Sequence, residues 1–104
     1  MIPEAEKYIA LINEKLAGKE MENAVFYFRQ KRYVSSLIYL DKIIAEYPDN
    51  TQWVEAKYLK AKILFLRGER KNEAVELLRQ VIGYPAELRI KKDAEILLAQ
   101  IEKG

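Results

Sequence analysis

"YLDKIIAEYPDN" at residues 39–50 and "LLRQVIGYPAEL" at residues 77–88 are two apolar-periodic segments that both run into Tyr-Pro. Their apolar residues recur at intervals of three and four, which is typical of one buried face of a helix. A proline disfavours helical geometry at the residue before it, so each helix is expected to end before Pro48 or Pro85. Because two helices end in the same way 37 residues apart, the sequence predicts an internal repeat.

The rest of the chain is also helical in its periodicity, with turns between the helices. We expect a long first helix that begins near Pro3, which suits a first turn. It is favoured over a helix that breaks at Gly18, because residues 14–24 contain no proline to end it. Turns are expected at residues 29–32, at the sequence PDNT, and at Gly68, which suits the left-handed residue after a helix end. The later helices are predicted at about residues 33–46, 52–67, 71–82 and 86–102.

Small residues recur at matched places in the two predicted helix pairs. The turn residues Lys31 and Gly68 lie 37 apart, and Ser36 and Ala74, early in the second helix of each pair, lie 38 apart. Small residues let paired helices approach closely. The other matched small residues are Ala24, Ala61 and Ala99. The sequence therefore predicts an all-α fold, a short helical solenoid in which two helix-turn-helix repeats lie between a leading and a closing helix.

This pattern resembles the tetratricopeptide repeat, in which a helical pair carries a small residue early in its second helix and a closing proline. The resemblance implies a right-handed solenoid of tetratricopeptide-like repeats. Residues 1–104 would form a single repeat domain, which is expected to be a fragment of a longer protein. The residues that carry the resemblance are Tyr27, Ser36, Leu40 and Pro48 in the first repeat and Ala74, Leu78 and Pro85 in the second.

A narrower resemblance is carried by residues 16–50, which are similar to a stretch of the BamD-type outer-membrane assembly lipoproteins. It extends over nearly all of this chain, which would correspond to the C-terminal part of such a protein. Related periplasmic repeat proteins of the Tol-Pal system share the Tyr-Pro endings. The resemblance implies a periplasmic, outer-membrane-associated scaffold in the machine that inserts β-barrels, although this sequence lacks the lipid-bearing cysteine and its leader. Lys31 and Ser36 also depart from the glycine and alanine common at their places. The matching residues are Leu16, Ala17, Glu20, Ala24, Phe26, Tyr27, Tyr33, Tyr47, Pro48 and Asp49.

The composition argues against an enzyme, a metal site and a cofactor site. The chain has no histidine and no cysteine, which removes the commonest general bases, nucleophiles and transition-metal ligands. Its two serines, Ser35 and Ser36, have no base available, and its carboxylates alternate with lysine and arginine as on solvated helix faces. The net charge of +2 is too small to indicate nucleic-acid binding. No apolar run is long enough to span a membrane.

Two candidate surfaces for protein partners remain. An apolar surface is predicted on the first helices of the pairs, where further repeats would cover it or a partner would dock in it. A basic edge is predicted at the turns, where cations are either merely solvated or steer an acidic partner segment. Glu46, Asp49 and Glu55 lie at the opposite, Tyr-Pro edge. The candidate contact residues are Met21, Val25, Phe28, Leu59, Ile63 and Leu66 for the apolar surface and Arg29, Arg32, Arg67 and Arg70 for the basic edge.

The sequence thus favours a non-enzymatic protein–protein interaction scaffold of outer-membrane protein assembly. The alternative is a cytoplasmic tetratricopeptide adaptor or a self-associating module with no role in the envelope. In either case the expected partners are proteins or peptide segments, and the apolar surface would also allow a homo-oligomer.

Overall fold

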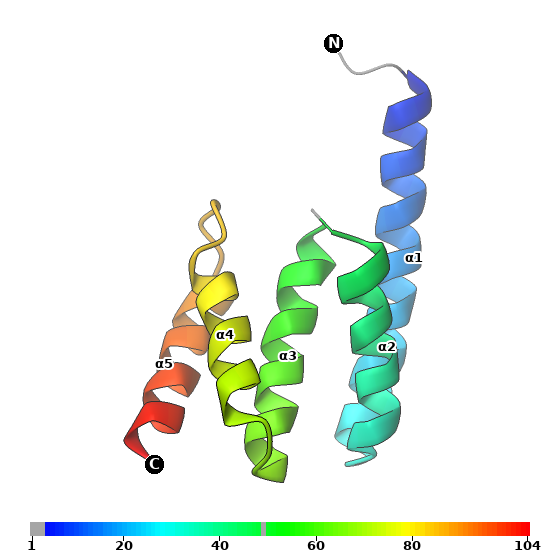
Figure 1. The fold of residues 1–104 in the computed structure, drawn as a ribbon. Coiled ribbons are helices and arrows are strands. Elements are labelled where there is room, and N and C mark those ends of the chain that lie inside the picture. The colour runs from blue at the N-terminus through cyan, green and yellow to red at the C-terminus, as the bar shows by residue number, and fades with distance from the viewer. Residues whose placement is uncertain (1–3, 49) are drawn as a thin grey trace. The chain divides into compact units, whose positions relative to one another are not determined.

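The computed structural model describes residues 4–48 and 50–104, and these residues form five helices and no strand (Figure 1). The all-α helical-repeat fold is confirmed. The expectations for Pro3 and Asp49 lie outside the described residues. The helices are α1 (Glu4–Arg29), α2 (Tyr33–Glu46), α3 (Thr51–Arg67), α4 (Lys71–Ile82) and α5 (Ile90–Lys103).

The predicted bounds hold for the first four helices and are wrong for the last. α1 continues through Gly18 without a break, and α2 ends at Glu46, directly before Tyr47 and Pro48. α5 begins at Ile90 and not near residue 86. After Pro85, the backbone N–H of Ala86 donates to the Tyr84 carbonyl at 2.8 Å, which makes a tight turn in place of a helical one. The helix therefore starts several residues after the proline.

The chain divides into two compact units, residues 1–53 and 54–104, which are described separately. The expectation of one domain stays a prediction. In the first unit α1 packs against α2, and the small residues Ala24 and Ser36 are fully buried. The Ser36 hydroxyl Oγ donates to the Ala24 carbonyl at 2.8 Å. The close approach that the small residues predicted is confirmed for this helix pair.

In the second unit polar contacts join α3 to α4, and α4 packs against α5. The buried alanines Ala61 and Ala74 lie on α3 and α4. Ala99, the third residue of the predicted alanine series, is exposed, and Ala94 is the buried alanine of α5. The matched spacing of Ala99 was therefore misleading, since it lies on the solvent side of α5. The remaining buried residues of α4 and α5 are Leu77, Leu78, Val81, Leu97 and Ile101.

The clearest sign of the repeat is an identical helix end in each unit. Lys31 and Gly68 both have a left-handed backbone, with φ of 60° and 66°. In the first unit the N–H of Lys31 donates to Phe28 and that of Arg32 to Tyr27, both at 2.9 Å. The same two bonds recur exactly 37 residues later, from Gly68 to Phe65 at 3.0 Å and from Glu69 to Leu64 at 3.1 Å. This pair of bonds is the Schellman motif, so α1 and α3 end in the same way.

Candidate functional site

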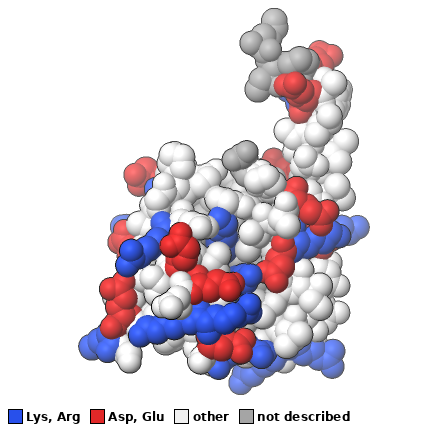
Figure 2. All heavy atoms as spheres, in the orientation of Figure 1, with Lys and Arg blue, Asp and Glu red and all other residues white. Residues whose placement is uncertain are grey.

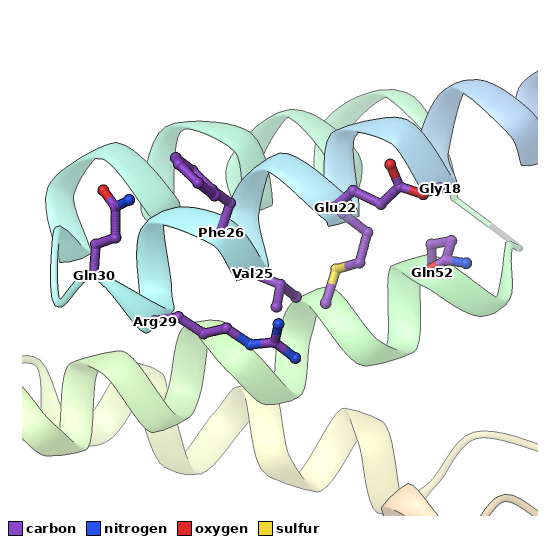
Figure 3. A pocket seen from close by; sticks show the side chains of 8 residues that line it. Gly18, Glu22, Val25, Phe26, Arg29, Gln30 and Gln52 are labelled. Carbon is purple, nitrogen blue, oxygen red and sulfur yellow. The ribbon is translucent and has the colours of Figure 1, made fainter.

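A shallow depression lies on one side of α1 in the first unit. Its volume is about 720 Å³, and Met21, Val25, Phe26 and Arg29 of α1 line it together with Gln52. Met21, Val25 and Arg29 are spaced by four residues, so they lie on one face of the helix. Figure 3 shows the Arg29 side chain extending beside Val25. The depression therefore combines apolar side chains with one cation.

The apolar candidates of the first unit are placed differently from one another. Met21 and Val25 are half-buried and line the depression. Phe28 is also half-buried, but its ring packs against the ring of Tyr33, with 5.8 Å between centroids. Phe26, which the sequence did not single out for this role, lines the depression in its place and is largely exposed. Two features of the sequence could have identified Phe26 as a lining residue, namely its apolar side chain and its position next to Val25.

The apolar candidates on α3 differ in their exposure. Leu59 is 8% exposed and Ile63 is 0% exposed, whereas Leu66 is 50% exposed. The side chains of Leu59 and Ile63 are thus less accessible than that of Leu66, and the prediction that they contact a partner stays a prediction. Apolar residues at helical spacing are equally compatible with a core and with a groove, and at these two positions the structure favours the core.

The basic candidates differ between the two turns. Arg29, Lys31 and Arg32 at the end of α1 are exposed, and the structure gives them no ion pair among the described residues. In the second unit, Arg67 Nε lies 2.9 Å from Glu69 Oε1, and Arg70 Nη1 lies 3.5 Å from Glu73 Oε1. Surface pairs of this kind contribute little to stability, but they reduce the positive charge that a partner would meet.

The candidate cations therefore form two groups. Those at and after the end of α1 have no ion pair among the described residues, whereas Arg67 at the end of α3 and Arg70 before α4 each lie near a glutamate. Figure 2 shows basic and acidic side chains interspersed on the face it draws. Whether the two turns lie along one edge stays a prediction. Two of the acidic residues that the sequence places at the Tyr-Pro edge, Glu46 and Glu55, are both exposed.

The sequence did not identify Lys57, which is a buried lysine on α3. The residue is 6% exposed and shares its helix face with Val54, Ala61 and Leu64. Its ammonium Nζ donates to Gln80 Oε1 on α4. Burial lowers the pKa of Lys57, and the nearby charge of Glu76 partly opposes this shift. The spacing of Lys57 from its apolar neighbours was a signal that this lysine lies on the core side.

Among the described residues, no three or more acidic, histidine or cysteine side chains form a cluster that could hold a metal ion. A search of the same residues for a helix of membrane-spanning length and hydropathy also finds none.

Comparison with known proteins gives one match. Residues 2–78 match the family YfiO, which is described as an outer membrane lipoprotein. These residues make up about three quarters of the chain and include the depression on α1 and both Schellman turns. No curated protein and no solved structure is similar enough to count as a match.

Proposed function

We propose that this chain, which belongs to the YfiO family of outer membrane lipoproteins, is a non-enzymatic protein–protein interaction module of outer-membrane protein assembly. Family membership supports a protein-interaction role in that process, and the helical repeat is an architecture that offers extended surfaces to partners. The proposal places the working protein in the periplasm, associated with the outer membrane.

The observation that carries the proposal is the depression on α1. Met21, Val25 and Phe26 supply apolar contact area there, and Arg29 supplies an exposed charge at its end. Apolar anchors beside a single cation are typical of a surface that holds a segment with hydrophobic side chains and a carboxylate. A helical or extended segment of a partner would bury apolar side chains against Met21 and Val25 and set an acidic side chain against Arg29.

The cation contributes orientation more than affinity. Arg29 is exposed, so its attraction to a carboxylate is screened by salt and acts mainly on the rate of association. Glu22, at another point of the same rim, repels a partner carboxylate placed in the reverse direction. The two charges together would select one direction of the bound segment.

The test is affinity capture from envelope and cytosolic extracts with the wild-type protein and two matched variants. Val25→Glu places a charge in the depression, whereas Val34→Glu places the same charge on α2 at an exposed valine outside it. We expect an outer-membrane assembly protein to be captured by wild type and by Val34→Glu, and to be lost with Val25→Glu. Helicity of each variant is checked by circular dichroism.

Two results would contradict the proposal. Equal loss of the partner with both folded variants would show that the depression is not the docking site. Partners found only in the cytosolic extract would instead favour a cytoplasmic adaptor.

A further inference from the structure

The first half of α1 carries a row of exposed apolar side chains that the proposed function does not use. Ile9, Ile12 and Leu16 are 56%, 54% and 46% exposed, and Ala5 before them is exposed as well. These four residues, named here the α1 seam, are spaced by four, three and four. This is the a/d spacing of a coiled coil, with Ile9 and Leu16 at a and with Ala5 and Ile12 at d.

The α1 seam is not the side of the helix that α2 covers. Ala17 and Ala24 are fully buried, and the Ala24 carbonyl accepts the bond from Ser36 of α2. Ala17 follows Leu16 by one residue, which places it about 100° away around the helix. α1 is also longer than α2, with 26 residues against 14, and its first turns extend beyond α2 (Figure 1). Among the described residues of this unit, the α1 seam therefore has no partner.

We propose that the α1 seam pairs in an antiparallel coiled coil with the α1 seam of a second copy of this chain. In such a pairing each a residue faces a d residue of the other helix. Ile9 then faces Ile12 of the second copy, and Leu16 faces Ala5, and each contact occurs twice because of the two-fold symmetry. The four layers are wholly apolar, and Ala5, the smallest of the four side chains, meets the larger Leu16.

The charges beside the α1 seam favour this antiparallel register. It brings Lys15 beside Tyr8 of the second copy and Glu6 beside Asn13, so no like charges meet. A parallel, in-register pairing would continue the d positions to Lys19 and set two ammonium groups against each other, which is unfavourable. The antiparallel register leaves Lys19 outside the four layers. This self-complementarity is why a second copy is the proposed occupant.

The association is expected to be weak and reversible. Four layers form a small interface, but α1 is already helical within the folded unit, so pairing does not require a disordered segment to fold. The mass of the protein should therefore rise with concentration from 12.2 kDa towards twice that value.

Sedimentation equilibrium of wild type and two variants tests the proposal. Ile12→Glu places a carboxylate in two of the four layers and should weaken the dimer by at least about a hundredfold. Ile38→Glu is the matched control, because Ile38 is 64% exposed but lies on α2; its dimerisation should equal that of wild type. A monomeric wild type at the highest soluble concentration would overturn the proposal, and so would equal effects of the two variants.

Disulfide trapping tests whether the two helices pair in an antiparallel direction. Unlike the glutamate variants, it introduces no charge that could disturb folding. The chain has no cysteine, so Ala5→Cys and Leu16→Cys each introduce a unique thiol. Oxidation of a mixture should give mainly the cross-linked pair that contains one of each variant. A predominance of the Leu16→Cys homodimer would overturn the antiparallel arrangement.

Discussion

Replacing Lys31 by glycine should stabilise the first unit, because Lys31 adopts a backbone conformation that favours glycine. Its φ is 60°, and Gly68, at the equivalent place in the second unit, has φ of 66° and the same pair of hydrogen bonds. A left-handed conformation costs a residue with a Cβ about 1–2 kcal/mol. Glycine removes this cost but loses about 0.5–1 kcal/mol more conformational entropy on folding.

The difference between these two ranges spans about 0–1.5 kcal/mol, and its centre gives the expectation for Lys31→Gly, a gain of about 0.5–1 kcal/mol in the free energy of unfolding. For a unit of this size, that gain corresponds to a rise of about 2–8 °C in the melting temperature. Urea denaturation followed by circular dichroism at 222 nm measures the free energy, and a thermal scan measures the melting temperature.

Lys31→Ala is the matched control. It removes the same exposed side chain but keeps the Cβ, so its stability should stay within about 0.5 kcal/mol of wild type. The reciprocal variant Gly68→Ala should be less stable, and the cost is one of backbone strain, since a Cβ at Gly68 would meet no atom within 4 Å. If Lys31→Gly is no more stable than Lys31→Ala, the left-handed backbone at residue 31 does not carry the expected cost.

Three further changes test the packing of the helices. Gly18→Ala should stabilise α1 by about 0.5–1 kcal/mol, because a Cβ there meets no atom within 4 Å; an unchanged urea midpoint would contradict this. Ser36→Ala should cost about 1 kcal/mol or less, but Ser36→Leu should cost about 1–3 kcal/mol, since the site is fully buried against Ala24; equal stability of the two variants would show that the helices do not approach closely. The folded-state pKa of Lys57 lies below its usual 10.5, so the unfolded chain binds more protons between the two values and the stability of wild type rises with pH there. Lys57→Met should therefore gain most over wild type below the folded-state pKa, and this advantage should shrink as the pH approaches 10.5; an advantage that grows with pH would contradict the prediction.

The helices and the repeat were predictable because local chemistry determines them. Pro48 ends α2 whatever the rest of the chain does, and the turn residues Lys31 and Gly68 sit at the spacing that the structure confirms. The start of α5 was not predictable in the same way. Pro85 shows where a helix ends, but the tight turn at Ala86 depends on a backbone bond that the sequence pattern does not reveal.

The candidate site was only partly predictable, because periodicity does not separate a core residue from a docking residue. Val25 and Ile63 have similar side chains and similar spacing, yet Val25 lines an open depression and Ile63 is fully buried. The sequence pattern also does not reveal which cations form ion pairs, because this depends on the geometry of the side chains. Arg67 and Arg29 have the same expected role in the sequence, but only Arg67 has an acidic side chain at 2.9 Å.

The most direct test of the proposed function is photo-cross-linking from the depression on α1 in living cells. A photoreactive amino acid is placed at Val25, and in a control protein at Glu95, which is exposed on α5 and lies outside residues 2–78. We expect a cross-link from position 25, but not from position 95, to a protein of the outer-membrane assembly machinery. A cross-link that forms only from position 95 would contradict the proposed function. The absence of any cross-link from position 25 to an envelope protein would contradict it as well.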